Sequence, residues 1–380
     1  MRIVYCIAGT RHSGGMERVL ANKANWLVEH GYEVVIVTTD QHGEEPFFSL
    51  HPSIKCYDLA INYEDNNGSS FLDKALNYPL RQFRHRSRLK ALLKRIKADI
   101  VISMFCNDAS FLPSIDDGSA KILEIHFSRF KRLQYGRKGI WAVADRWRSW
   151  RDVATARRFD RFVVLTREDR ANWGALDNIT AIPNARSFEP GIPSALETRR
   201  VLAVGRLCYQ KGFDMLVDVW RKVCDVVPDW TLRIVGSGES EDALRARIKE
   251  LALDSRVEIV SAKASEMPAI YRDASILVMS SRYEGLPMAL LEGQASGLPI
   301  VSFACKCGPK DIIHDGVDGY IVPEGDIDAM AEKIIKLAGD TDLRKRMGAA
   351  ALKASADYSE SEVMGLWEEL FRTVCIKKTI

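Results

Sequence analysis

Short runs of β-branched and aliphatic residues alternate with longer amphipathic segments along the whole chain. Five apolar runs lie in the first half, at residues 2–8, 33–39, 99–105, 121–127 and 161–166, and five lie in the second half, at residues 200–206, 231–238, 256–262, 274–281 and 298–304. Such runs are typical of strands that are buried on both faces of a parallel sheet. The segments between them, such as residues 15–31, have the three- and four-residue spacing of helices. The alternation predicts two doubly wound α/β domains.

The expected boundary between the domains is a stretch rich in proline and glycine. These residues cluster between positions 182 and 200, at Pro183, Pro190, Gly191 and Pro193. We therefore expect Rossmann-like domains at residues 1–186 and 187–361. The amphipathic segment 362–380 is predicted to pack back on the first domain. Two such domains that face one another leave a cleft at the carboxyl ends of their strands, where ligands of this fold class bind.

Composition narrows the class of protein. The 380 residues are 47% hydrophobic and 28% charged with a net charge of +3, which suits a soluble globular protein of two domains. No run approaches the roughly 18 apolar residues that span a bilayer, and the first residues fit a strand better than a signal peptide. The eight cysteines form no C-x-x-C pair or zinc pattern, so we expect reduced thiols and a cytoplasmic protein.

Two cations follow the first apolar run of the second half. Arg206 comes directly after Gly205, and Lys211 follows five residues later. An anionic ligand would enter at the carboxyl end of such a strand, where Arg offers a planar fork of donors and Lys a mobile charge. The two side chains are therefore candidates for holding a pyrophosphate, and a pair of solvated surface cations is the alternative.

Glycines occupy two further loops that follow apolar runs. Gly236 and Gly238 precede a predicted helix, but no third glycine completes a dinucleotide-binding fingerprint, so a tight turn beside the ligand is the better interpretation. Gly14 and Gly15 stand before the first predicted helix, where backbone N–H groups could approach a phosphate or a sugar. A plain flexible turn explains them equally well. His126, at the end of an earlier run, is expected to face the same cleft, although a structural histidine is the more common outcome.

Two glutamates with seven residues between them, Glu284 and Glu292, follow the apolar run at residues 274–281. Pro287 is predicted to be the first residue of a helix, because its missing N–H costs nothing there. Glu284 then lies in the loop that faces the cleft, and Glu292 lies on the second helical turn. The free backbone N–H groups at this helix start would point at the ligand. They belong to Leu286, Met288 and Ala289.

Carboxylates repel phosphate oxygens but accept hydrogen bonds from the hydroxyls of ribose and hexose. Beside Arg206 and Lys211, the two glutamates therefore indicate a sugar nucleotide as the ligand. A general acid/base pair is the rival interpretation. It fits less well, because the helix start and the two cations favour ionised carboxylates and leave no proton donor.

The chain resembles the retaining glycosyltransferases of family 4, which have the two-domain GT-B fold. The resemblance covers nearly the whole chain and rests on the segments GGMERVL, IPNA, GRLCYQKGFD, IVGSGE, EGLPMALLE and CGPKDIIHDGVDGYIVPEGD, in the family's order. It implies an acceptor domain at residues 1–186 and a nucleotide-sugar-binding domain at residues 187–361. It also implies transfer of a hexose or N-acetylhexosamine from a nucleoside diphosphate, UDP by default, to a hydroxyl of a growing glycan. The late GP-x-x-II pattern is similar to that of transferases of bacterial capsule and lipopolysaccharide assembly.

Residue by residue, the resemblance implies a set of site residues. Arg206 and Lys211 would hold the diphosphate. Glu284 would touch the donor sugar, Glu292 would bind the ribose, and His126 would lie near the transferred sugar. The remaining positions would bind the donor (Gly14, Gly15, Gly236, Gly238, Gly285, Leu286, Pro287 and Met288) or flank its base (Val260 and Lys263).

Two departures from the family's pattern are present. The family often has Gly-Gly and Glu in the late loop, where this chain has Cys307 to Asp311, which leaves the donor-sugar preference open. Ala185 replaces a glycine that often follows the Asn of IPN, which affects only the hinge geometry. No D-x-D motif stands at a strand exit. We therefore predict no metal site, no cofactor and no divalent-ion requirement.

The first domain carries a basic bias. Residues 81–97 hold eight Lys or Arg and no acid, and residues 121–170 hold fourteen bases against six acids. The second stretch is interleaved with aromatic residues, Phe130, Trp141, Trp147 and Trp150. A solvated charged face explains this bias as well as a surface that rests on anionic lipid at the inner face of the membrane, where a lipid-linked acceptor would lie. Nucleic acid is disfavoured as a partner, because no recognised motif accompanies the charge.

Other functions remain open. A nucleotide-sugar 2-epimerase of the same architecture would need acids and bases around the second carbon of the sugar, and the chain offers no clear pair. A non-catalytic sugar-nucleotide-binding protein would keep the cleft. An NAD-dependent oxidoreductase is disfavoured by the incomplete fingerprint. The sequence leaves the donor sugar, its base, the acceptor and the linkage undecided.

Overall fold

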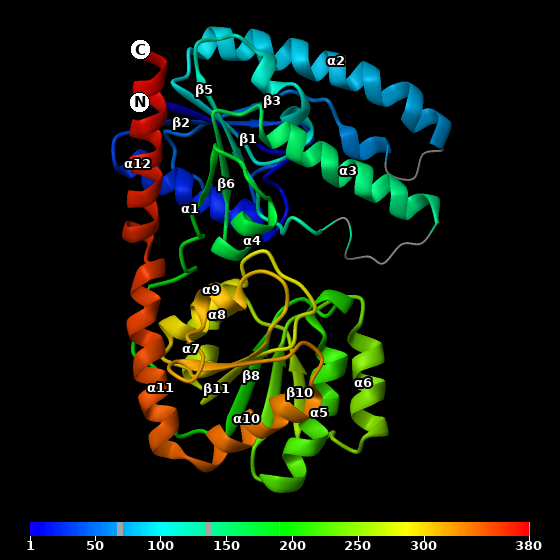
Figure 1. Cartoon of the computed structure of the whole chain (residues 1–380), viewed down its shortest axis with the longest axis vertical. Coiled ribbons are helices and arrows are strands. Elements are labelled where there is room, and N and C mark those ends of the chain that lie inside the picture. Colours follow the sequence, from blue (N-terminus) through cyan, green and yellow to red (C-terminus); the bar gives the residue numbers. More distant parts are fainter. Residues whose placement is uncertain (67–70, 132, 134–138, 190, 380) are drawn as a thin grey trace. The chain divides into compact units, whose positions relative to one another are not determined.

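The computed structural model describes residues 1–66, 71–131, 133, 139–189 and 191–379, which form two units with one parallel sheet each (Figure 1). The first unit comprises Met1–Leu165, Arg170–Ile182 and Met364–Ile380, and the second comprises Thr166–Asp169 and Pro183–Val363. The division at Ile182 and Pro183 lies inside the expected linker. The last helix belongs to the first unit from Met364 onward.

Seven strands of the described residues form the sheet of the first unit. Their order is β3-β2-β1-β4-β5-β6-β7, and every neighbouring pair is parallel. The strands are β1 (Arg2–Cys6), β2 (Glu33–Thr38), β3 (Lys55–Asp58), β4 (Ile100–Ser103), β5 (Ala120–Glu124), β6 (Arg161–Val164) and β7 (Ile179–Ala181). The central strands are buried on both faces, as their unbroken β-branched and aliphatic runs predict.

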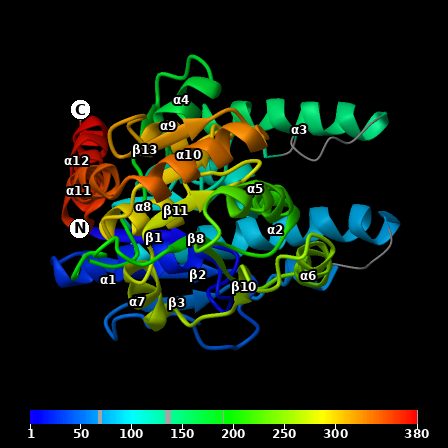
Figure 2. The ribbon, with the colours of Figure 1, turned by 90° about the horizontal axis from the view of Figure 1, so that it is seen from below.

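Four longer helices accompany this sheet, and a short one follows β6. They are α1 (Gly15–Glu29), α2 (Phe71–Ile96), α3 (Ile140–Ala156), α12 (Glu360–Thr379) and the short α4 (Arg167–Asn172). Helix α1 ends just before Gly31, whose φ of +83° is one that L side chains rarely adopt. Helices α2 and α3 extend from the sheet in the same direction (Figures 1 and 2).

Helix α12 packs on α1 through aromatic and polar contacts. The Lys23 ammonium lies 3.8 Å from the ring centroid of Trp367, and the Tyr32 hydroxyl donates to Glu368 at 2.8 Å. Phe371 is fully buried and meets the ring of Tyr32 edge-on. A buried lysine covered by a tryptophan is uncommon in a helix that otherwise presents aliphatic residues to the sheet.

The described residues of the second unit form six parallel strands in the order β10-β9-β8-β11-β12-β13. The strands are β8 (Arg200–Val204), β9 (Thr231–Val235), β10 (Val257–Val260), β11 (Ile276–Met279), β12 (Ile300–Phe303) and β13 (Gly319–Val322). The helices are α5 (Phe213–Val226), α6 (Glu241–Glu250), α7 (Met267–Arg272), α8 (Met288–Ala295), α9 (Pro309–Ile312), α10 (Ile327–Gly339) and α11 (Thr341–Ala354).

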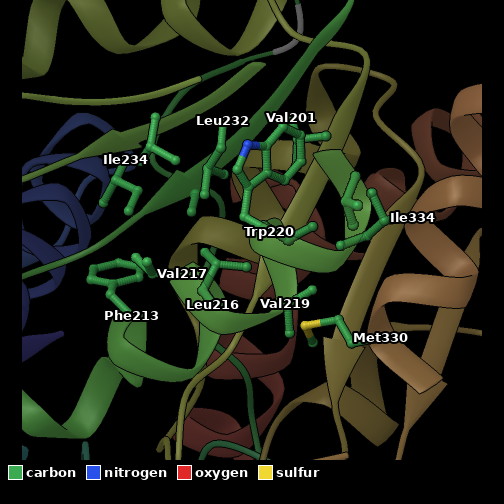
Figure 3. Close-up of a cluster of buried hydrophobic side chains, with 14 of the residues drawn as sticks. Val201, Phe213, Leu216, Val217, Val219, Trp220, Leu232, Ile234, Met330 and Ile334 are labelled. Atoms are coloured by element: carbon green, nitrogen blue, oxygen red, sulfur yellow. The ribbon is translucent and has the colours of Figure 1, made fainter. Parts of the chain in front are cut away.

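The core of the second unit is centred on Trp220 of α5. This side chain is fully buried and lies in one cluster with Val201, Leu232 and Ile334, which come from two strands and from α10 (Figure 3). Helices α5 and α10 pack side by side (Figures 1 and 2). Burial of each such side chain contributes roughly 1.5–3 kcal/mol, so the core fixes the strands whose exits carry the candidate site.

The predicted fold class is confirmed, since both units are doubly wound parallel sheets with helices packed against them. In each sheet the strand order reverses at one place, between β1 and β4 in the first unit and between β8 and β11 in the second. The carboxyl ends of the strands on either side of such a switch point diverge, and ligands of doubly wound proteins bind there.

Candidate functional site

The switch point of the second unit brings together three of the predicted site residues. Strand β8 leads through Gly205 to Arg206, and strand β11, which pairs with β8, leads to the loop that holds Glu284. Lys211 follows in the short 3₁₀ turn Tyr209–Lys211, just ahead of α5. The strand exits therefore place two cations and one carboxylate at the position that the sheet order favours for a ligand.

Lys211 and Glu284 form an ion pair. The Lys211 ammonium lies 2.7 Å from Oε1 of Glu284, and the Ser281 hydroxyl donates to the same oxygen at 2.6 Å. The Glu284 side chain is 6% exposed, whereas that of Lys211 is 21% exposed. An ammonium has three N–H donors, so Lys211 can hold Glu284 and an anionic ligand at the same time. The sequence led us to expect Lys211 at the diphosphate and Glu284 at the donor sugar. In the structure the two side chains contact each other.

Gly212 fixes the loop that carries Lys211. Its φ is +63°, and a Cβ atom at this position would lie 2.2 Å from the carbonyl oxygen of Ser280. The Ser280 hydroxyl in turn donates to the Lys211 carbonyl at 2.9 Å. Sequence analysis assigned no role to Gly212 or Ser281. The sequence did contain a signal for Gly212, because this glycine stands directly between Lys211 and the start of α5.

Arg206 differs from Lys211 in having no ion-pair partner among the described residues. Its side chain is exposed, and the backbone on either side is held by the neighbouring loop, since Leu207 N–H donates to the Ser237 carbonyl at 2.9 Å. An arginine on a fixed backbone with an unpaired guanidinium suits recognition of an anion that arrives from solvent.

Gly236 and Gly238 have a packing reason to be glycine. A Cβ atom at Gly236 would lie 2.0 Å from the Gly205 carbonyl oxygen, and one at Gly238 would lie 2.4 Å from the Leu207 carbonyl oxygen. The loop after β9 can therefore lie directly against the backbone that carries Arg206. This contact explains both glycines without a ligand, so their donor-binding role stays a prediction.

Pro287 ends the loop before α8 and is a packing centre for its neighbours. Helix α8 begins at Met288, and Pro287 is its N-cap with φ −76° and ψ 99°. The prediction that Pro287 is the first helical residue is thus wrong by one position. A Cβ atom at Gly308 would lie 2.3 Å from Cδ of Pro287, so the late loop also packs here. Gly285 and Leu286 connect this turn to Glu284.

Glu292 lies on α8 as predicted, and a buried phenol holds it. The Tyr271 hydroxyl donates to Oε2 of Glu292 at 2.6 Å. Burial raises the pKa of Tyr271 well above its ordinary value, and the neighbouring Glu292 raises it further. Because the phenol stays neutral, it acts as a fixed hydrogen-bond donor that orients the carboxylate.

The two base-flanking candidates lie at the carboxyl end of β10. The Val260 carbonyl accepts the N–H of Gly236 at 2.8 Å, which ties this strand end to the glycine loop. The Lys263 side chain is exposed, and its backbone N–H donates to Glu266 at 2.6 Å. Both residues therefore lie on the same edge of the sheet as Gly236.

The late loop, where the sequence departs from the family's pattern, has a strained backbone. Cys307 is buried with φ +65°, a conformation that favours glycine, and Gly308 follows with φ +107°. The Cys307 N–H donates to Glu168 at 3.1 Å, and the Asp311 carboxylate accepts the backbone N–H of Arg167 at 2.9 Å. Hydrogen bonds to the start of α4 therefore fix the late loop. A glycine pair at this place would instead give its backbone more conformational freedom.

Three predicted residues belong to the first unit. Gly14 is the N-cap of α1, and a Cβ atom at Gly15 would meet nothing within 4 Å among the described residues. The fold of the first unit itself therefore does not require a glycine at position 15. His126 follows β5, and its Nε2 atom lies 3.0 Å from Oε1 of Glu124.

Two family models match the sequence and divide it as the sheets do. "Glycosyltransferase Family 4" matches residues 13–187, and "Glycosyl transferases group 1" matches residues 187–354. The chain belongs to this glycosyltransferase family. It is 29% identical over 390 residues to the amylovoran biosynthesis glycosyltransferase AmsD of Erwinia amylovora, which covers 97% of this chain and 99% of that protein.

A further relative supports this assignment, and a solved structure shows the same fold. An α-1,4-N-acetyl-D-galactosaminyltransferase of Campylobacter jejuni, named for a glycan acceptor on PP-undecaprenol, is 26% identical over 381 residues, 98% of this chain and 99% of that protein. The structure of TarM from S. aureus, in complex with UDP, fondaparinux and α-GlcNAc-glycerol, superimposes with a TM-score of 0.77 at 17% identity and covers 97% of this chain and 99% of that chain. This structural neighbour confirms the GT-B fold.

This glycosyltransferase has a pocket of about 570 Å³ in its first unit, which sequence analysis did not predict. The pocket lies at the switch point, since Ala8 follows β1 and Phe105 follows β4. Its chemically distinctive lining residues are three aromatic residues, three cations and two acids: Tyr78, Phe105, Phe127, Lys131, Arg148, Arg151, Asp145 and Asp152. The rings of Phe105 and Phe127 meet edge-on at 5.3 Å between centroids.

The described ranges of this glycosyltransferase hold no group of three or more His, Cys, Asp or Glu that could bind a metal ion. No described helix is both long and apolar enough to cross a bilayer.

Proposed function

We propose that this glycosyltransferase moves a hexose or N-acetylhexosamine from a UDP-sugar to a hydroxyl of a growing cell-surface glycan, with retention of configuration and without a divalent ion. The observation that carries the proposal is the Lys211–Glu284 ion pair at the switch point of the second unit, with the unpaired Arg206 on the adjoining loop. A cation and a carboxylate that share one ligand-facing position suit a ligand that has both phosphate oxygens and hydroxyls.

In this proposal each predicted residue has one partner on the donor. Arg206 and Lys211 hold the diphosphate, Glu284 accepts a hydroxyl of the transferred sugar, and Glu292 accepts the ribose hydroxyls. Tyr271 keeps Glu292 oriented, because its hydroxyl already donates to one carboxylate oxygen. The N–H groups at the start of α8 face the diphosphate with the positive end of the helix dipole. Gly14 and Gly15 let the first unit approach the donor, and Val260 and Lys263 flank the base.

The reaction breaks the bond between the anomeric carbon and the β-phosphate oxygen. Negative charge builds up on the leaving UDP, and an oxocarbenium-like ring forms. Cations that are already in place stabilise this charge more than they stabilise the substrate, which lowers the barrier. The acceptor hydroxyl attacks on the face that the phosphate leaves, forms the new bond to the anomeric carbon, and gives its proton to the leaving phosphate.

The acceptor would occupy the pocket of the first unit. Aromatic rings suit the apolar faces of sugars, Asp145 and Asp152 can accept hydroxyls, and the cations suit an anionic group such as a lipid-linked diphosphate. The side chains of Trp141, Trp147 and Trp150 on α3 are more than half exposed. Such tryptophans among basic residues suit a surface that rests on anionic lipid at the inner face of the membrane. The names of AmsD and the Campylobacter relative point to acceptors in polysaccharide and lipid-linked glycan assembly.

Steady-state kinetics of two cation variants test the donor site. A thermal-shift screen against UDP-glucose, UDP-galactose, the two UDP-N-acetylhexosamines and GDP-mannose first identifies the donor. Arg206→Ala and Lys211→Ala should each lower kcat by roughly 10²- to 10³-fold in hydrolysis or transfer of that donor. Lys222→Ala is the matched control, since Lys222 is a surface cation on α5 that pairs with Asp328.

Near-normal turnover in both cation variants would overturn the donor assignment. Binding of the donor by the wild-type protein without hydrolysis or transfer would favour a non-catalytic sugar-nucleotide-binding protein. Proton NMR that detects inversion at the second carbon of the sugar would favour the 2-epimerase. Activity that disappears in EDTA and returns with Mg²⁺ or Mn²⁺ would refute the metal-independent mechanism.

A further inference from the structure

A buried ionic cluster lies behind His126 in the first unit. The Lys23 ammonium on α1 lies 2.5 Å from Oε1 of Glu124, the last residue of β5. Nε2 of His126 lies 3.0 Å from the same oxygen. The side chains of Lys23, Glu124 and His126 are 6%, 1% and 8% exposed. One carboxylate oxygen therefore contacts both a lysine and a histidine with almost no access to solvent.

Glu124 is kept ionised in this cluster, whereas burial lowers the pKa of the Lys23 ammonium although Glu124 opposes that shift. Burial alone would raise the pKa of Glu124, but Lys23 and His126 outweigh it and lower the pKa to about 2. The other titratable group beside the pair is Tyr5 of β1, whose pKa is raised by burial and by Glu124, so the phenol stays neutral. Neither Oε2 of Glu124 nor Nε2 of His126 makes an aligned hydrogen bond to a described residue. At 3.0 Å from Oε1, Nε2 of His126 needs only a change of ring orientation to donate a hydrogen bond to Glu124.

We propose that Lys23 and Glu124 are positioning residues that fix the orientation and the tautomer of His126. In this arrangement Glu124 accepts a hydrogen bond from the protonated Nε2 of His126, which leaves Nδ1 to contact the substrate. Lys23 keeps Glu124 ionised and in place. The inference rests on the proposed function in one respect, that His126 lies beside the transferred sugar. A carboxylate that holds the far nitrogen of a functional histidine sets the tautomer of the ring.

The cluster also joins the last helix to the histidine. Trp367 of α12 covers the Lys23 ammonium at 3.8 Å from its ring centroid, and the Tyr5 ring lies 5.9 Å away on another side. An aromatic face stabilises a desolvated ammonium and adds no second carboxylate that would compete with Glu124. The Lys23 ammonium therefore connects three elements that are distant in sequence, namely α1, β5 and α12.

The test removes the charges singly and together. Lys23→Met leaves a buried carboxylate without its lysine, and Glu124→Gln leaves a buried ammonium without its carboxylate, so both variants should lower the thermal unfolding midpoint. Each should also lower kcat of sugar-nucleotide hydrolysis by about 10- to 100-fold, with the donor KM changed less than about threefold. The double variant Lys23→Met/Glu124→Gln has no unpaired charge, so it should regain most of the unfolding midpoint and none of the lost kcat.

A matched control comes from a second buried lysine. Lys121 in β5 pairs with Asp117, and its side chain is 6% exposed, as is that of Lys23. Lys121 contributes to neither proposed binding site. Lys121→Met should lower the unfolding midpoint to a comparable extent and leave kcat within about twofold of wild type.

Nitrogen-15 NMR of the histidine side chains provides a measurement that does not depend on turnover. In the neutral imidazole form of His126, the wild-type protein should carry the proton on Nε2, and Glu124→Gln and the double variant should show a mixture of the two tautomers. A double variant with the kcat and the tautomer of wild type would overturn the inference. Absence of turnover by the wild-type protein would remove the proposed function alone, because the NMR result still decides whether Glu124 sets the tautomer.

Discussion

The two units share the order of their first six strands but differ in the chemistry at their switch points. In the second unit, the strand exits place Lys211 and Glu284 in one ion pair beside Arg206, on loops fixed by glycines. In the first unit, the corresponding position is a pocket of about 570 Å³ lined by aromatic and charged side chains. The sheet determines where a ligand can bind, and the loops determine which ligand binds.

The two units also differ in how they use a lysine–glutamate pair. Lys211 is 21% exposed and can contact both Glu284 and a ligand, whereas Lys23 is 6% exposed and is enclosed by Glu124 and the ring of Trp367. A partly exposed cation can bind an incoming anion at modest desolvation cost, whereas a fully buried one can only maintain a local arrangement. In our two proposals, the same two residue types therefore serve binding in one unit and positioning in the other.

The largest stability effect predicted from this comparison concerns Gly212. Gly212→Ala adds a Cβ atom that would lie 2.2 Å from the Ser280 carbonyl oxygen at a φ of +63°. Because the backbone must move, we expect a loss of about 3 kcal/mol or more in the free energy of unfolding and a strong loss of donor turnover.

Gly316→Ala is the control for this substitution. Gly316 has a φ of +76°, but a Cβ atom there would meet nothing within 4 Å among the described residues. It should cost only about 1 kcal/mol in urea-induced unfolding, from the strained conformation alone. Equal losses in the two variants would show that the Ser280 contact does not fix the Lys211 loop.

Acidification tests the buried lysine–glutamate pair of the first unit. The pKa of Glu124 is lowered to about 2, so its contribution to stability is complete above about pH 4.3, the unfolded value, and is lost as the pH falls toward 2. The full loss would be about 3 kcal/mol. Denaturant unfolding from pH 5 to pH 2.5 should show this decline in the wild-type protein and a shallower one in Glu124→Gln. Parallel curves would contradict it.

A smaller effect is expected from the pocket of the first unit. Phe127→Ala removes a ring that meets Phe105 edge-on and lies 4.1 Å from the Lys131 ammonium. We expect the acceptor KM to rise about tenfold and the donor KM to stay unchanged, since the pocket is assigned to the acceptor. A changed donor KM with an unchanged acceptor KM would reverse the assignment of the two switch points.

The smallest effect is expected at the membrane. Trp147 and Trp150 are 55% and 65% exposed on α3. The double variant Trp147→Ser/Trp150→Ser should reduce flotation with liposomes that contain anionic lipid by several-fold, roughly 1 kcal/mol in binding. Neutral liposomes provide the control. Flotation that does not depend on anionic lipid would remove the membrane proposal.

The sequence predicted the interior of each sheet better than its edges. All ten predicted strands are present, whereas β3, β7 and β13 were not predicted. These three are edge strands. An edge strand is covered on one side only, so β3, with the sequence KCYD and mostly exposed side chains, lacks the apolar run that marks a buried strand.

The candidate site was predictable where a residue type carries its own chemistry, as for Lys211 and Glu284 after their strands. Its supporting residues were less visible. Gly212 and Ser281 act through tertiary contacts that spacing along the chain does not show. Lys23 is the clearest case, because a lysine in an amphipathic helix is normally a surface residue, and only the fold brings Glu124 and Trp367 to it.

The position of α12 has a consequence for how the polypeptide matures. Residues from Met364 onward complete the unit to which α1 and β1 belong, and Trp367 covers Lys23 of α1. During synthesis the ammonium of Lys23 stays uncovered until this helix emerges, so the earliest-made half reaches its final form last. Nascent chains halted before residue 360 should therefore expose α1 to protease, and release of the remaining helix should protect it.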